Sequence, residues 1–350
     1  MNLRHRLLPM FAIAVTGVVA LAGCSAPAPG AGSDTSAGSK LAGSITVYNA
    51  QHEELTQAWA DGFTKESGVE VVLRNGSDSE LGNQIVQEGD ASPADVFLTE
   101  NSPAMSLVDT AGLLAPVDSS VLEQVPSDYQ PSSGNWSAIA ARSTVLVYNP
   151  SLISEAELPS SLLQLADPSW KGRWAASPSG ADFQAIVSGM VELEGSDATE
   201  EWLTSMKDNV VPYQGNSAVM KAVNAGEIPV GLIYHYYWYA DQSGTGENSA
   251  NSELHYFTNE DSGAFVSLSG GGVLASSEKR SSAQAFLAYI TSAPGQRILQ
   301  TGTSFEYPVA ADIQANPDLV PLSELRAPKI DPSNLDSKLV TDLMTRAGLL

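Results

Sequence analysis

The feature that most constrains the fold of this chain is a regular alternation of short apolar runs with amphipathic stretches from residue 45 onwards. Short apolar runs are typical of buried strands, and apolar residues spaced by three and four are typical of one helix face. The order strand, helix, strand, helix, strand indicates a parallel sheet covered by helices. The strands are predicted at Ile45–Asn49, Val69–Leu73 and Asp95–Thr99, and the helices around Leu55–Phe63 and Leu81–Val86.

The same alternation starts again after residue 143, which predicts a second α/β lobe. Each lobe is expected to contain a mostly parallel sheet flanked by helices. In the second lobe, strands are expected at Thr144–Tyr148, Arg173–Ala176 and Pro229–Ile233, and helices at Ser160–Leu165, Asp182–Glu192 and Ala218–Val223.

Two late segments, an apolar run at Ala264–Leu274 and a helix at Ser282–Ile290, have no neighbouring elements of their own. We expect them to complete a sheet begun earlier, so that the chain crosses between the lobes more than once through a hinge of strands. The predicted N-terminal lobe is residues 44–142 plus about 268–318. The predicted C-terminal lobe is residues 143–267 plus about 319–350.

The charge balance limits the classes of partner. The 350 residues include 17 Lys and Arg against 40 Asp and Glu, a net charge of −23. Nucleic acid and anionic lipid surfaces attract clustered Lys and Arg, so the sequence argues against nucleic acid as a partner. With 43% hydrophobic and 16% charged residues, the composition is that of a soluble globular protein.

The N-terminus has the layout of a secretory signal. Arg4 and Arg6 precede an apolar run from Leu7 to Leu21, which is short for a membrane-spanning helix. Leu21 to Cys24 resembles the lipobox of bacterial lipoproteins, in which cleavage precedes an acylated cysteine. An ordinary signal with an incidental cysteine is the alternative.

We therefore predict a signal peptide at residues 1–23, lipidation at Cys24, and a flexible linker rich in Ser, Ala, Gly and Pro at 24–43. The expected location is extracytoplasmic, with the lipid anchor holding the protein to the cell membrane. Cys24 is the only cysteine in the chain, so intrachain disulfides and thiolate metal sites are excluded.

Enzyme motifs are missing or out of context. The run from Gly270 to Ala275 fits the loose pattern G-x-G-x-x-A, but it lacks the surrounding strand, helix and acidic residue of a dinucleotide site. The sequence contains no G-x-S-x-G, no H-E-x-x-H, no P-loop and no EF-hand loop. We therefore do not expect an enzyme, and an extracellular hydrolase is the weakest alternative.

The most distinctive segment is Tyr234–Tyr239, which has five aromatic residues in six positions just past a predicted strand. On composition alone these rings could pack in a core or line a cleft for a carbohydrate or an amino acid. His52 and Glu100 also follow predicted strands. Because ligands bind beyond the carboxyl ends of strands in open α/β sheets, all three groups are expected to meet in the cleft between the lobes.

At this point the chain resembles a known family, the ferric-iron-binding proteins of bacterial ABC importers. The likeness extends from about residue 45 to the C-terminus. It rests on Tyr48–His52, Pro93–Glu100, Leu165–Pro168, Trp170–Gly172, Ala225–Ile228 and Tyr236–Trp238. The resemblance implies the two-lobed periplasmic-binding-protein fold and four metal ligands, which are His52, Glu100, Tyr236 and Tyr237. His235 is the stand-in if His52 is misplaced.

The resemblance also implies an anion that completes the metal shell, phosphate or carbonate, with or without a water molecule. Its predicted binding residues are Ser179, Gly180, Ala181, Asn216, Asn101 and Arg142. Ser179 to Ala181 begin a predicted helix, where free N–H groups favour an anion. The chain departs from the family's pattern at Asn101, where glutamine is frequent, and at Tyr234, where asparagine is frequent. Arg142 either balances the anion or is a surface residue.

These ligands suit ferric iron. Fe(III) is a hard, triply charged ion that prefers anionic oxygen, and two phenolates plus one carboxylate supply three negative charges beside a neutral imidazole. We therefore predict a monomeric, lipid-anchored protein that captures Fe(III) and delivers it to an ABC importer permease. The alternative is an importer component for an anion or a small organic solute, in which the aromatic residues form a cleft wall.

Overall fold

The computed structural model describes residue 41 and residues 43–350. The predicted signal peptide, the lipidation site Cys24 and nearly all of the predicted linker lie outside the described residues. In the part described, no helix combines the length and the apolar character needed to cross a membrane.

The first sheet contains the three strands predicted near the N-terminus and three that come later in the chain, one of them only two residues long. Its order is β2 (Glu70–Asn75), β1 (Ser44–Asn49), β3 (Val96–Leu98), β10 (Val266–Leu274) and β5 (Trp136–Tyr148). Strands β2, β1 and β3 are parallel, and β10 runs antiparallel to β3, to β5 and to the short β4 (Leu114–Ala115). The late apolar run thus completes a sheet begun earlier, as predicted.

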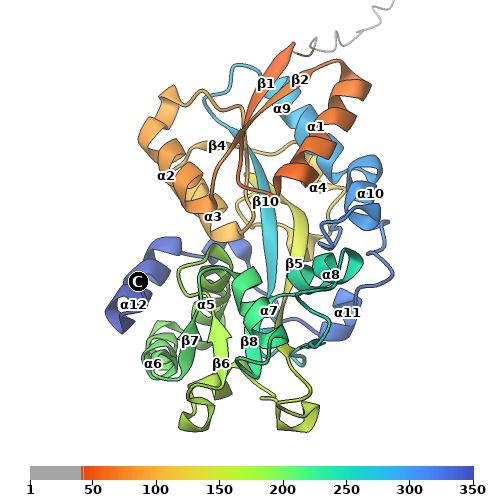
Figure 1. Cartoon of the computed structure of the whole chain (residues 1–350). Helices are drawn as coiled ribbons and strands as arrows, with labels where there is room; N and C mark the ends of the chain where they lie inside the picture. The colour runs from red at the N-terminus through yellow and green to blue at the C-terminus, as the bar shows by residue number, and fades with distance from the viewer. Residues whose placement is uncertain (1–40, 42) are drawn as a thin grey trace, which may run out of the picture. The chain divides into compact units, whose positions relative to one another are not determined.

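Helices cover both faces of this sheet (Figure 1). Ile45 and Val47 of β1 pack in one core with α1 (Glu53–Ser67), α9 (Arg280–Thr291) and α10 (Ala293–Thr301). Phe97 of β3 packs in the opposite core with α2 (Asp78–Glu88) and α3 (Ser102–Thr110). The alternation of side chains along a strand sends neighbouring residues to opposite cores.

The second sheet has the order β5, β8 (Val230–Tyr234), β6 (Trp174–Ala176) and β7 (Val210–Pro212), with β9 (Glu253–His255) also paired to β5. Strands β8, β6 and β7 are parallel, and β5 is antiparallel to β8. The helices of this part are α5 (Ala181–Glu194), α6 (Ser196–Lys207), α7 (Asn216–Asn224), α8 (His235–Ser243) and α12 (Ser337–Ala347). Two cores again lie on opposite faces, one with α5, α6 and α12 and one with α7.

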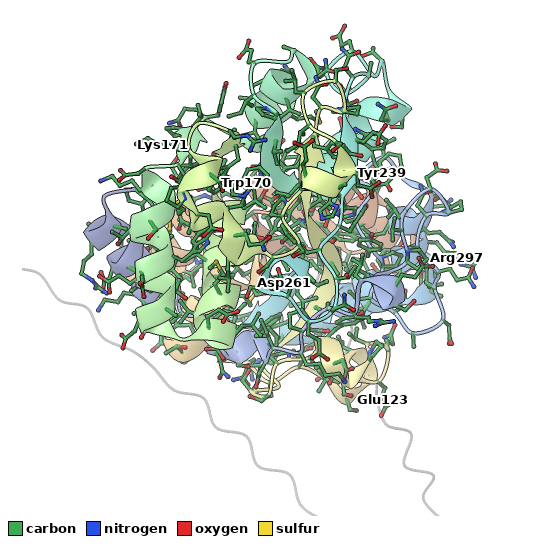
Figure 2. The ribbon with its side chains drawn as sticks, turned by 90° about the horizontal axis from the view of Figure 1, so that it is seen from below. Glu123, Trp170, Lys171, Tyr239, Asp261 and Arg297 are labelled. Carbon is green, nitrogen blue, oxygen red and sulfur yellow. The ribbon has the colours of Figure 1, made fainter. Side chains whose placement is uncertain are left out.

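Short elements complete the described chain. The remaining α-helices are α4 (Ser119–Leu122) and α11 (Leu322–Leu325). The 3₁₀ turns are Gly89–Ala91, Ser127–Tyr129, Glu155–Glu157, Leu162–Ala166, Pro168–Trp170, Ser262–Ala264 and Pro332–Asn334. The short helix expected at Ser160–Leu165 is therefore a 3₁₀ turn that begins two residues later. Beside it, Trp170 is buried while Lys171 is exposed (Figure 2).

Strand β5 links the two sheets and is longer than predicted. It begins at Trp136 rather than Thr144, and all of its residues are buried. Its residues up to Ser143 pair with β10, and those from Thr144 onwards pair with β8. Apart from Trp136 and Ile139, the residues of its first half are small or polar, so the usual apolar signal of a strand is weak there. Pairing with β10, which comes much later in the chain, makes this half a strand.

The glycine run at 270–272 lies inside β10 and not at a turn between a strand and a helix. A Cβ atom on Gly271 would lie 2.6 Å from Cδ1 of Leu287 and 3.0 Å from Cγ2 of Ile139. Gly271 therefore allows helix α9 to approach the sheet closely, which explains this glycine without a dinucleotide.

Candidate metal site

His52 lies where β1 ends and α1 begins, at the N-cap of the helix. Its Nε2 atom is 3.3 Å from Oε1 of Glu100, and its Nδ1 atom is 2.9 Å from Oε1 of Glu306. The imidazole also meets the ring of Tyr236 edge-on, with 5.0 Å between the centroids. Burial favours the neutral imidazole, but the charge of Glu306 and hydrogen bonds to both carboxylates raise the pKa of His52 to about 10.

Glu100 follows β3, as the sequence predicts, and its side chain is 21% exposed. Its Oε1 atom accepts a hydrogen bond of 2.9 Å from the hydroxyl of Tyr236 and lies 3.9 Å from Nη2 of Arg142. Burial opposes ionisation, but the positive charge of Arg142 and the hydrogen bond from His52 lower the pKa of Glu100 to about 2. This carboxylate is therefore ionised at neutral pH.

Tyr236 and Tyr237 occupy the first turn of α8, directly after β8. Their rings stack with 4.3 Å between centroids. The hydroxyl of Tyr237 donates to Oδ2 of Asp182 at 3.2 Å, and that of Tyr236 reaches the same atom at 3.5 Å. Burial and the negative charges of Asp182 and Glu100 raise the pKa of both phenols. The structure thus brings together all four residues predicted as metal ligands.

Asp182, the second residue of α5, also belongs to this group and was missed by the sequence analysis. Besides both phenols, its carboxylate accepts hydrogen bonds from Nδ2 of Asn216 at 2.6 Å and Nδ2 of Asn101 at 3.1 Å. Burial and the charge of Glu100 raise the pKa of Asp182 to about 6. The one signal available in the sequence was its position, directly after Ser179–Ala181, which were predicted to bind an anion.

The residues predicted to bind an anion do not all share the same hydrogen-bond partners. Asn101 and Asn216 both donate to Asp182, and Gly180 and Ala181 form the N-terminus of α5. The Ser179 hydroxyl instead donates to Oε1 of Gln214 at 3.5 Å and is exposed. In place of the family's asparagine, Tyr234 directs its hydroxyl to Oδ1 of Asn101 at 3.4 Å.

Arg142 is an interior residue of β5, which begins earlier than the Thr144 predicted as its start. Its side chain is fully buried, so the alternative of a surface arginine is wrong. Its Nη2 atom donates to Oε1 of Gln51 at 2.8 Å and to Oε2 of Glu306 at 3.1 Å. The guanidinium carbon lies 5.6 Å from the centroid of the Tyr236 ring. This buried positive charge therefore faces Glu100, Glu306 and a phenol.

His235 does not serve as an alternative ligand, because both of its ring nitrogens are already used. Its Nδ1 atom accepts from the backbone N–H of Ser143 at 3.2 Å, and Nε2 lies 2.8 Å from the carbonyl of Phe305. Burial lowers the pKa of His235 to about 4, so its imidazole is neutral.

A cavity of about 640 Å³ adjoins the site. Its walls include His52, Tyr236 and Tyr237, together with Glu53 and Lys221. Among the described residues, no three His, Cys, Asp or Glu side chains are arranged to hold a metal ion by themselves.

The chain is similar to known proteins along most of its length. Residues 91–333 match the family described as bacterial extracellular solute-binding protein. The "Fe(3+)-binding periplasmic protein" of Serratia marcescens is 63% identical over 87% of this chain and 90% of its own length. The "Major ferric iron-binding protein" of Neisseria meningitidis serogroup B is 37% identical, with 87% and 93% of the two chains covered.

A solved structure extends the likeness to three dimensions. Iron-bound HitA from Pseudomonas aeruginosa superposes with a TM-score of 0.82 at 41% identity, over 87% of this chain and 99% of the other. The predicted two-lobed α/β fold is thereby confirmed. The relatives are solute-binding proteins and not enzymes. The chain belongs to the bacterial extracellular solute-binding proteins, among the periplasmic ferric-iron-binding members.

Proposed function

We propose that this protein captures Fe(III) outside the cytoplasm and delivers it to an ABC importer, held to the membrane through lipidated Cys24. One observation carries the iron site: two phenols, two carboxylates and an imidazole from four separate segments meet within hydrogen-bond distance. The names of the Serratia and Neisseria relatives support the same cargo. The solute-binding family supports an ABC importer as the transport partner, and the sequence around Cys24 supports the lipid anchor.

The ligand set that we propose is His52, Glu100, Asp182, Tyr236 and Tyr237. With both phenols deprotonated, its oxygen ligands carry four negative charges, more than the three needed to neutralise Fe(III). Arg142, in contact with Glu100 and with the face of Tyr236, offsets the excess. The adjoining cavity gives water or an incoming chelate access to the remaining coordination position.

The test of this function is a visible absorption spectrum. We expect the purified protein to turn coloured when ferric citrate is added, because tyrosinate bound to Fe(III) absorbs visible light by charge transfer. One equivalent of iron per protein should give the full band. A protein that stays colourless and carries no iron after desalting would refute the proposal, and a thermal-shift screen of anions and small organic solutes would then be the next measurement.

Asp182 also bears on the predicted phosphate or carbonate. Its carboxylate already receives the hydrogen bonds of Asn101 and Asn216, which the resemblance assigns to the anion. We propose that this carboxylate supplies the negative charge locally, so that iron binds without an added anion. The alternative is the prediction from the resemblance, that phosphate or carbonate from solution completes the metal shell. The two alternatives differ in whether iron binding needs an added anion.

The Asp182→Ala variant distinguishes binding that relies on Asp182 from binding that relies on an added anion. In buffer free of phosphate and carbonate we expect at least about a hundredfold weaker iron binding, since one unit charge at about 4 Å contributes about 4 kcal/mol at an effective dielectric of 20. Added phosphate or carbonate should restore much of the affinity. Asp197→Ala is the matched control, because Asp197 is the second residue of α6 and is exposed. If the unmodified protein itself needs an added anion, Asp182 does not replace it.

A further inference from the structure

Behind His52 lies a buried network that neither the ligand set nor the relatives' names explain. It consists of Gln51, Arg142, Ser269 and Glu306, all of which are buried. Gln51 donates from Nε2 to Oε2 of Glu306 at 3.1 Å and to Oγ of Ser269 at 2.9 Å. Its Oε1 atom accepts from the backbone N–H of His52 at 2.7 Å. The Gln51 side chain therefore connects the His52 backbone to Glu306.

Glu306 divides its two oxygens between different partners. Oε2 accepts from Arg142 and Gln51, both at 3.1 Å. Oε1 lies 2.9 Å from Nδ1 of His52 and has no other polar partner in the described part of the chain. A fully buried carboxylate oxygen needs a donor, because an unsatisfied one costs free energy. The donor available to Oε1 is a proton on Nδ1 of His52.

The backbone around Glu306 is held in place from several sides. Phe305 has a φ of 53°, in the left-handed region that is costly for a residue with a Cβ atom. Its carbonyl is the partner of Nε2 of His235. Tyr307 exchanges backbone hydrogen bonds of 2.9 Å with Ala141 of β5, next to Arg142. This segment is therefore fixed to β5 and α8, and it presents the Glu306 carboxylate to His52.

We propose that Glu306 is a positioning residue, which holds His52 with Nδ1 protonated and turns Nε2 toward Glu100 and the phenols, so that Nε2 can bind the metal once its own proton has been displaced. In a metal-bound imidazole, one nitrogen binds the metal and the other carries a proton. A carboxylate that accepts a hydrogen bond from the protonated nitrogen fixes the tautomer and the ring orientation, and it makes the first nitrogen a stronger ligand for the metal. The inference rests on the proposed function, because it assigns Glu306 a role in iron binding.

The test is a double-mutant cycle with Glu306→Gln and His52→Ala. Loss of a group that hydrogen-bonds a metal-bound histidine typically lowers metal affinity by about 10- to 100-fold. We expect Glu306→Gln to do so in the protein that retains His52. In the His52→Ala background the same change should add less than about twofold, because Glu306 acts through His52. An equal loss in both backgrounds would overturn the proposal and indicate that Glu306 acts through Arg142 or through the fold.

Glu123→Gln is the control for the change of charge. Glu123 is exposed at the end of α4, where Figure 2 shows its side chain at the surface, and it is outside the proposed ligand set. Its replacement should leave iron affinity unchanged. Thermal unfolding of each variant shows whether it is folded. If the unmodified protein does not bind iron at all, the proposed function fails, and that outcome differs from a cycle whose effects simply add.

A second measurement needs no variant. We expect histidine ¹⁵N NMR of the unmodified protein loaded with Ga³⁺, a diamagnetic substitute for Fe(III), to show His52 bound through Nε2. Its Nδ1 proton should exchange slowly with water because Glu306 accepts its hydrogen bond. Binding through Nδ1, or an Nδ1 proton that exchanges rapidly, would refute the role of Glu306 even if Glu306→Gln does not fold.

Discussion

Replacing Tyr236 and Tyr237 together by phenylalanine is expected to abolish both the visible colour and tight ferric binding. The change removes the two phenol oxygens but keeps the stacked rings, so the packing of α8 should survive. Two of the hard anionic ligands are lost, and Fe(III) binds weakly without them, so we expect an affinity loss of at least about a thousandfold. Absorption spectra and competition with a chelator measure the two effects.

Tyr239→Phe is the matched control for this double variant. Tyr239 lies on the same helix and its hydroxyl is 3.3 Å from that of Tyr256, outside the proposed ligand set. We expect this variant to keep both colour and affinity. A double variant that still binds iron tightly, with the charge-transfer band intact, would show that the colour and the site reside elsewhere in the protein.

Acidification is expected to release the iron. At neutral pH the imidazole of His52 and both phenols carry protons in the metal-free protein, because the pKa of His52 is about 10 and the pKa values of both phenols lie above their usual value. Iron must displace these protons, so apparent affinity falls as pH falls. With three protons displaced, the loss is up to about a thousandfold per pH unit. Below about pH 6 the protonation of Asp182, whose pKa is about 6, adds to the loss.

Two measurements check this pH dependence. Titration calorimetry in buffers of different ionisation enthalpy counts the protons released on binding, and competition with a chelator between about pH 5 and 8 gives the slope of the affinity. Glu100 should contribute nothing to this slope, because its pKa of about 2 keeps it ionised throughout. An affinity independent of pH over this range would contradict a site with two tyrosinate ligands.

The elements that carry the proposed ligands were predictable because their signals are local. The apolar run of β1 and the helix spacing of α1 place His52 at a junction, and the same holds for Glu100 after β3 and for the tyrosines after β8. Strands that run in parallel bring such junctions to one edge of a sheet. The first half of β5 gave no comparable signal, because its pairing with β10 stabilises residues that are small or polar.

The residues that sequence reasoning missed are those whose surroundings come from distant parts of the chain. Glu306 sits in an irregular segment, and its partners Gln51 and Arg142 are 255 and 164 residues away. Asp182 lies in the first turn of a helix, where carboxylates are common and carry no signal of a site. Only packing of α5 against Asn101 and the phenols makes it part of the site.

By itself the amino-acid sequence determined the kinds of atoms available to a ligand and the strand ends that carry most of them, because both depend on composition and on short-range periodicity. The tertiary structure decided which carboxylates reach the phenols and which carboxylate each nitrogen of His52 faces, because burial and hydrogen bonding depend on contacts between segments far apart in the chain.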